Sequence, residues 1–236
     1  MANNSIKNLN TILRYNFKII FNGKLIWYFI AATIILIGFM YLFCLNPDNV
    51  IGEKSVFSVI IIPAFLIIFY PSVFGIQNDA DAKILEILFG IPNYRYRVWG
   101  TRLAMILISA IAVIFLYSLL GILFLYPINP FYMTFNVIFP IFFMGTLAFM
   151  FSTLTRNGNA TALIMILIIL FFYLILGNSL GASKWNIFMN PYDQPSDMHP
   201  SVFLAIVWQN KIILFIATVV TTIIGLLRLQ KREKFI

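Results

Sequence analysis

Long apolar stretches separated by short polar segments occupy most of the chain. About 20 helical residues cross a hydrocarbon core of about 30 Å, whereas barrel strands alternate in polarity and are about half as long. The continuous apolarity therefore predicts an all-α polytopic membrane protein with six transmembrane helices. None of the six stretches contains Asp, Glu, Lys, Arg or His; they cover residues 25–45, 55–76, 103–125, 131–154, 160–180 and 212–227.

The sixth stretch is too short, as counted, to cross a bilayer. We therefore expect its helix to begin near Ser201, with a span over about residues 205–229. Lys211 would then lie near the outer end of this span. We expect its long side chain to snorkel toward the lipid headgroups.

Basic residues are distributed unequally between the two sides of the predicted bundle. Thirteen of the 16 Lys and Arg residues fall on the side that holds both termini, against Lys54, Lys184 and Lys211 on the other. By the positive-inside rule, the side with both termini is cytoplasmic and the membrane is the inner (plasma) membrane. The net charge of +8 is thus mainly a topological signal, and we expect no nucleic-acid partner. Because 61% of the 236 residues are apolar, the chain is expected to be one transmembrane domain without a soluble domain.

The arm of residues 1–24 precedes the first span and is amphipathic. Its apolar residues recur at helical spacing, while basic and polar residues occupy the other faces. The pattern predicts a helix that lies in the cytoplasmic interface of the membrane. It could serve as a surface anchor alone or as a connection to a cytosolic partner. The apolar positions are Ile6, Leu9, Leu13, Phe17, Ile20 and Phe21.

The connection of residues 77–102, between the second and third predicted spans, carries the most specific pattern. Its first part predicts a short helix of its own, because Asn78 or Asp79 can cap the N-terminus while Gly90 and Pro92 end the helix. Such a helix could dock on another protein, or it could simply return the chain to the bilayer.

This predicted helix has one polar and one apolar face. Asp79, Lys83 and Glu86 share the polar face, with Asp79 placed to pair with Lys83 at the i, i+4 spacing. The opposite face is formed by Ala80, Ile84, Ile87, Leu88 and Ile91. We expect the apolar face to pack on the spans and the polar face to remain available for a partner.

The order of features in this connection resembles the permease subunits of ABC-2 type ABC transporters. It consists of acidic and basic residues, an apolar Leu-rich helix, Gly-x-Pro, a basic aromatic run and an Arg just before the next span. The matching residues are 79–89, Gly90, Pro92, 94–97 and Arg102. The resemblance extends to the amphipathic arm, the six spans and the tight turn of residues 155–159 before the fifth span.

In that family, the corresponding connection is similar to a coupling helix that docks on the ATP-hydrolysing subunit. The resemblance implies two ABC ATPase subunits and a second permease copy, in a homodimer or a heterodimer with a similar permease. Arg95 and Arg97 could equally well bind the phosphates of membrane lipid. The implied docking residues are Asp79, Asp81, Lys83, Glu86, Gly90, Pro92, Arg95 and Arg97.

The chain lacks the G-x-x-x-x-G-K-[ST] phosphate loop. Without its backbone amides and Lys to hold the phosphates, we expect no nucleotide hydrolysis by this chain and no cofactor in it. ATP and Mg are expected in the partner ATPase. The chain itself is therefore expected not to be an enzyme.

The outer segment of residues 181–204 is the other long connection. Its aromatic residues suit the headgroup zone of a membrane, which predicts an interfacial, partly helical lid. In ABC-2 relatives the corresponding region is similar to short re-entrant helices above the translocation path. His199 is the sole histidine and is expected to be a solvated loop residue.

Two other functional classes remain open beside export of a substrate. The chain could transmit ATP-driven motion to a periplasmic or cell-surface partner without transporting anything, or it could be a channel or carrier. A proton- or sodium-coupled carrier usually places carboxylates or a Lys near the midplane, and the predicted spans contain none. The sequence does not indicate the substrate.

Overall fold

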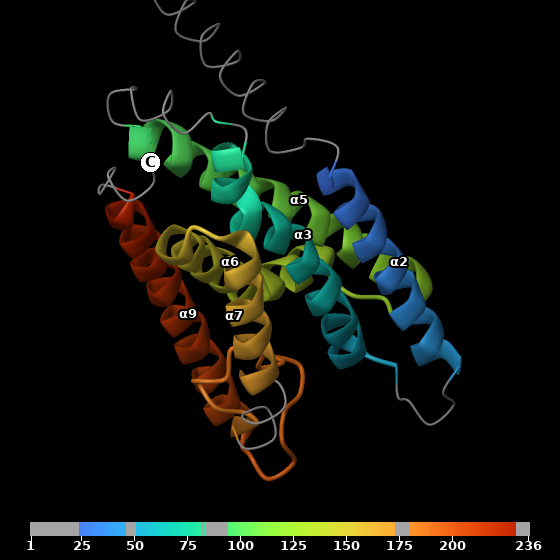
Figure 1. The fold of residues 1–236 in the computed structure, drawn as a ribbon. Helices are drawn as coiled ribbons and strands as arrows, with labels where there is room; N and C mark the ends of the chain where they lie inside the picture. The colour runs from blue at the N-terminus through green and yellow to red at the C-terminus, as the bar shows by residue number, and fades with distance from the viewer. Residues whose placement is uncertain (1–23, 46–50, 82, 84–93, 173–179, 230–236) are drawn as a thin grey trace, which may run out of the picture.

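Helices form all the regular secondary structure of the residues described in the computed structural model (Figure 1). The described residues are 24–45, 51–81, 83, 94–172 and 180–229. The elements in chain order are α2 (Lys24–Leu45), α3 (Glu53–Asp81), η1 (Arg95–Gly100), α5 (Thr101–Phe124), α6 (Pro130–Thr155), α7 (Gly158–Leu170) and α9 (Pro200–Arg228). The element η1 is a turn of π-helix that leads directly into α5. The other elements are α-helices.

Five helices in the described part of the chain are long and apolar enough to cross a membrane: α2, α3, α5 with η1, α6 and α9. They confirm the predicted all-α, multi-pass membrane character. Of the fifth predicted span, over residues 160–180, the described part includes most of the 13-residue α7, whereas residues 173–179 lie outside the described residues, so this span stays a prediction. The predicted arm lies outside the described residues, apart from Lys24 at the start of α2.

Local caps explain where the middle helices begin and end. The side-chain oxygen of Asn129 accepts hydrogen bonds from the backbone amides of the first turn of α6, and Pro130 occupies the first helical position. Arg156 ends α6 with a left-handed backbone (φ 57°). Asn157 then caps α7 in the same way as Asn129 caps α6.

Helices α3 and α6 form the centre of the bundle. Helix α3 packs against α2, α5, α6 and α7, whereas α6 packs against α3, α5, α7 and α9. The two central helices approach closely at Gly145, because a Cβ atom at this position would overlap the side chain of the fully buried Ile68. Small residues allow such close packing of helices in membranes.

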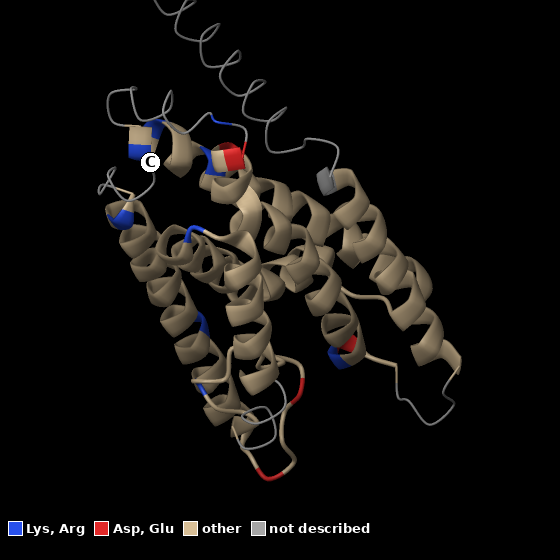
Figure 2. Ribbon diagram, in the orientation of Figure 1, with Lys and Arg blue, Asp and Glu red and all other residues tan. Residues whose placement is uncertain are grey.

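Charged side chains lie mainly at the two ends of the bundle (Figure 2). Consecutive helices alternate in direction, so the end of α3, the start of η1 and the ends of α6 and α9 share one end (Figure 1). We call this the basic end, because the end of α6 is followed by Arg156 and α9 closes with Arg228. The other end carries the 181–199 segment and the start of α3 (Figure 1).

Lys211 departs from its predicted environment. Helix α9 begins at Pro200, next to the predicted start, and His199 caps it. Lys211 is nevertheless only 5% exposed, and its ammonium group lies among aromatic rings. The predicted snorkelling is therefore wrong, because the rings of α6 and α9 cover this side chain. Since a cation lies within a candidate span, the lack of charges no longer argues against an ion-coupled carrier.

Candidate functional site at the base of the connection between α3 and α5

The structure describes five of the eight residues predicted to dock on an ATPase. Asp79 and Asp81 lie in the last turn of α3, Lys83 follows this helix, and Arg95 and Arg97 lie in η1. All five are therefore at the basic end, on the two chain segments that flank residues 84–93 (Figure 1). Outside the described residues lie Glu86, Gly90 and Pro92.

The predicted start of a separate helix at Asn78 or Asp79 is wrong. Helix α3 continues without interruption to Asp81, and Asn78 donates a side-chain hydrogen bond to the hydroxyl of Tyr70 (3.2 Å). Lys83 has a positive φ of 54°, which is incompatible with a continuous right-handed helix. Because nothing after Ile76 breaks the helix, the last turns of α3 include the polar residues that were expected to begin a new one.

Asp79 is buried and forms an ion pair with Arg102. Both residues are about 95% buried, and a guanidinium nitrogen of Arg102 donates a hydrogen bond to the Asp79 carboxylate. The predicted pairing of Asp79 with Lys83 is therefore wrong, and Asp79 does not present its carboxylate to a partner at the surface. The pair joins the last turns of α3 to the first turn of α5, so it holds the two ends of the connection together.

Trp99 completes the environment of this ion pair. The centre of the Arg102 guanidinium lies 5.1 Å from the centroid of the Trp99 ring, which is itself buried. Two buried donors in this cluster, Arg102 Nε and Trp99 Nε1, have no hydrogen-bond acceptor among the described residues. An arginine offers five N–H donors, and its contacts here satisfy only part of them.

A second contact fixes the connection to α9. The hydroxyl of Tyr94, directly before η1, donates a hydrogen bond to the backbone carbonyl of Leu229, directly after α9. Around this contact, buried apolar side chains of α3, η1, α5 and α6 form a cluster of their own: Ile76, Tyr94, Val98, Trp99, Leu103, Phe149 and Leu229. The base of the connection is therefore anchored to four helices.

The surface of this site carries both signs of charge. Asp81, Lys83 and Arg97 are exposed, whereas Arg95 is half-buried with its guanidinium 5.3 Å from the ring of Tyr96. Tyr96 is itself 55% exposed. Exposed arginine beside an exposed aromatic ring can contact either an acidic protein surface or lipid phosphates, so both predicted roles of Arg95 and Arg97 stay open.

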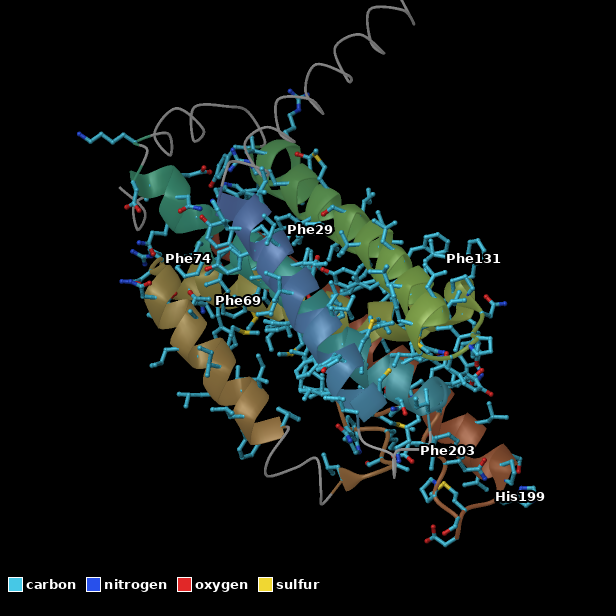
Figure 3. All side chains as sticks on the ribbon, turned by 90° about the vertical axis from the view of Figure 1, so that its right-hand side faces the viewer. Phe29, Phe69, Phe74, Phe131, His199 and Phe203 are labelled. Atoms are coloured by element: carbon cyan, nitrogen blue, oxygen red, sulfur yellow. The ribbon has the colours of Figure 1, made fainter. Side chains whose placement is uncertain are left out.

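At the opposite end, the 181–199 segment forms a series of turns packed on the bundle, and His199 begins α9 there (Figure 3). Its polar contacts to α3 are made by two residues: Asp193 pairs with Lys54 (2.7 Å), and Asn190 Nδ2 donates to Lys54 O (3.0 Å) and to Ser58 Oγ (3.2 Å). Residues 181–199 of the predicted lid form turns, and its last residues, 200–204, are helical because α9 begins at Pro200. Proline and asparagine occur at several of these turns and favour them over a helix.

Tyr192 connects this segment to α6. Its hydroxyl accepts a hydrogen bond from Asn136 Nδ2 (2.8 Å), and its ring packs against Phe57 and Tyr132. Burial raises the pKa of Tyr192 to about 12, and the hydrogen bond from Asn136 opposes part of this rise. Because a free Tyr has a pKa of about 10, the folded state prefers the neutral phenol. Its contribution to stability is present below pH 10 and is lost as the pH rises through the folded pKa.

We predict that Tyr192→Phe destabilises the protein by about 1–2 kcal/mol, because the substitution leaves the Asn136 amide with no partner. Asn136 is 3% exposed, and its Oδ1 already lacks a partner among the described residues. The measurement is unfolding of the purified chain in mixed micelles. Tyr126→Phe, at a side chain that is 39% exposed, is the matched control and should change stability little. Equal effects of both substitutions would count against this contact.

Comparisons of the chain with protein-family models, with curated proteins and with solved structures found no match. The function proposed below therefore rests on the residues and on their arrangement. Of the features at the base of the connection, the ion pair has a signal in the sequence. Asp79 and Arg102 flank the connection at similar distances from two consecutive antiparallel spans, which places them at the same depth.

Proposed function

We propose that this chain is the membrane-spanning permease subunit of an ATP-driven ABC-2 type exporter, which moves a substrate outward using a separate ATPase subunit. In this proposal the basic end faces the cytoplasm, and residues 84–93 contact the ATPase. The observation that carries the proposal is the anchored base of the connection between α3 and α5. A docking element must be held firmly at its base if a force on it is to move the spans.

The contacts at the base define what such a force would move. The ion pair of Asp79 with Arg102 links α3 to α5, and the hydrogen bond from Tyr94 to Leu229 adds the end of α9. Because α3 and α6 lie at the centre of the bundle, a displacement of α3 reaches most of the other helices. ATP-driven motion at the basic end would thus change the packing along the whole bundle.

The position of Glu86 provides a direct test of docking. A photo-reactive amino acid at position 86 of the tagged full-length chain, in its natural host, should form an adduct with a protein that contains a phosphate loop. The same amino acid in place of Tyr126, at the other end of α5, should not do so, because that end faces the opposite side of the membrane. Adducts at position 86 that contain no ATP-binding protein would overturn the proposal.

Charge reversal tests whether this contact transmits energy. Once the ATPase has been identified, Glu86→Lys should lower the stimulation of its hydrolysis by the permease on the order of tenfold, because a like-charge contact opposes docking. The amount of the variant in the membrane should remain unchanged, which immunoblotting of membrane fractions would check. Full stimulation by the variant would exclude Glu86 from the interface.

A mechanical role without transport is the second candidate, and the 181–199 segment favours it. This segment contacts α3 through Lys54 and Ser58, α6 through Asn136, and α9 through Asn210. Movement of these helices would therefore move the segment and any partner bound to it. In reconstituted complexes, substrate flux would indicate export, whereas hydrolysis that responds only to an outer partner would indicate mechanical transmission.

A further inference from the structure

Lys211 lies in an aromatic cage between α6 and α9. Its Nζ atom is 4.8 Å from the ring centroids of both Phe135 and Trp208. The rings of Tyr132 and Phe139 lie somewhat farther away, at 5.8 and 6.0 Å. The negative faces of aromatic rings attract a cation, so these four side chains stabilise the ammonium in place of water.

Within the described part of the chain, the charge of Lys211 is not neutralised. The ion pairs found there join Lys54 to Asp193 and Arg102 to Asp79, and no hydrogen bond from Lys211 accompanies its ring contacts. An ammonium group carries three N–H donors, which aromatic rings satisfy poorly. A cation that is 95% buried without a counter-charge is costly for a fold that needs it only for packing.

Lys211 lies at a level of α9 that the 181–199 segment reaches. The preceding residue, Asn210, donates hydrogen bonds to the backbone carbonyls of Lys184 (3.0 Å) and Asn186 (2.8 Å). The 181–199 segment thus reaches the level of Lys211, about 11 residues or 16 Å from the start of α9. Lys211 therefore lies three residues before the midpoint of the 29-residue α9, within a helix that is long and apolar enough to cross a membrane.

The rings of the cage face the surroundings of the bundle. Tyr132 and Trp208 are each 51% exposed and Phe135 is 39% exposed, so the rings that cover the ammonium form part of the outer surface. Their exposed faces offer an apolar surface on two helices that are long and apolar enough to cross a membrane. A buried cation beneath exposed aromatic rings combines a positive charge with an apolar surface, the two properties that an acidic amphiphile requires of its site.

We propose that Lys211 binds the acidic headgroup of an amphiphile, a phosphate or carboxylate attached to an apolar chain. The ammonium donates hydrogen bonds to the headgroup oxygens and supplies the counter-charge. The apolar chain lies on the exposed rings of Tyr132, Phe135 and Trp208. This site is separate from the base of the connection between α3 and α5, and the inference does not depend on the proposed function.

The test compares an anionic with a neutral lipid on the purified full-length chain. Quenching of tryptophan fluorescence by brominated acyl chains measures binding of phosphatidylglycerol and phosphatidylcholine in detergent micelles. The wild-type chain should bind the anionic lipid roughly tenfold more tightly, as expected for one charge-assisted contact. Lys211→Met should remove this preference, while Lys211→Arg should keep most of it.

Lys184→Met is the matched control, because Lys184 also lies over a tryptophan ring, 5.7 Å from that of Trp185, and belongs to the same end of the bundle. This variant should retain the lipid preference.

Competition experiments identify which headgroups the site accepts. If dodecanoate displaces the brominated lipid, the site also binds carboxylates. If only unlabelled phosphatidylglycerol displaces it, the site binds phospholipids alone. An unchanged preference in Lys211→Met, with normal elution from a sizing column, would overturn the proposal. Displacement of the lipid by inorganic phosphate alone would overturn the requirement for an apolar chain.

Discussion

Replacement of Arg102 by Ala is expected to destabilise the folded protein by about 3–5 kcal/mol, because it leaves the carboxylate of Asp79 buried without a counter-charge. Both members of the pair are about 95% buried, so water cannot replace the lost guanidinium in the unchanged structure. The stacking of Arg102 on Trp99 is lost as well. The measurement is the midpoint of unfolding of the purified chain, titrated with a denaturing detergent in mixed micelles.

The double substitution Asp79→Leu with Arg102→Met separates charge from packing. It removes both charges and leaves apolar side chains, so it should cost less than Arg102→Ala alone. Lys54→Met breaks the exposed ion pair with Asp193, in which the two side chains are 59% and 50% exposed. This control should cost less than about 1 kcal/mol. Equal losses at the buried and the exposed pair would contradict the burial of Asp79 and Arg102.

The same double variant bears on the proposed function. If the ion pair joins the two ends of a docking element, its loss should reduce stimulation of the ATPase even where the apolar replacements preserve the fold. A purely structural ion pair would leave stimulation unchanged once stability is restored. The comparison therefore asks whether Asp79 and Arg102 transmit motion or only hold the fold together.

The main elements of the fold could be predicted from the sequence because membrane spans depend on local composition. A stretch of about 20 apolar residues forms a helix whatever its neighbours are, since the bilayer leaves no other partner for the backbone. The ends of α6 and α7 also follow from local signals, namely the caps Asn129 and Asn157.

The environments of charged residues were less predictable because they depend on contacts between helices. Asp79 was assigned to an exposed helix from its i, i+4 spacing to Lys83, yet its partner is Arg102 on the next helix. Lys211 was expected to reach the headgroups along its own helix, yet rings of α6 cover it. Helical periodicity identifies residues that share a face, but it does not identify what packs against that face.

Substitution of Gly145 by Val is expected to destabilise the protein by about 3 kcal/mol, in the upper part of the range for overpacked cores. A Cβ atom on Gly145 would overlap the Cδ1 and Cγ1 atoms of Ile68, which is fully buried on α3. Both helices belong to the centre of the bundle and have other neighbours, so neither can shift freely to make room. Unfolding in mixed micelles measures the loss, and elution from a sizing column like that of the wild-type chain would show that the variant is folded before unfolding begins.

A control and a compensating substitution make this test specific. Gly38→Val on α2 introduces the same side chain where no atom lies within 4 Å of the new Cβ, so it should cost less than about 1 kcal/mol. Ile68→Ala removes the atoms that the valine would meet, and the double variant Gly145→Val with Ile68→Ala should therefore be more stable than the sum of the two single losses predicts. Strict additivity would show that α3 and α6 do not meet at these residues. Such a result would also remove the central packing through which motion of the basic end is proposed to reach the rest of the bundle.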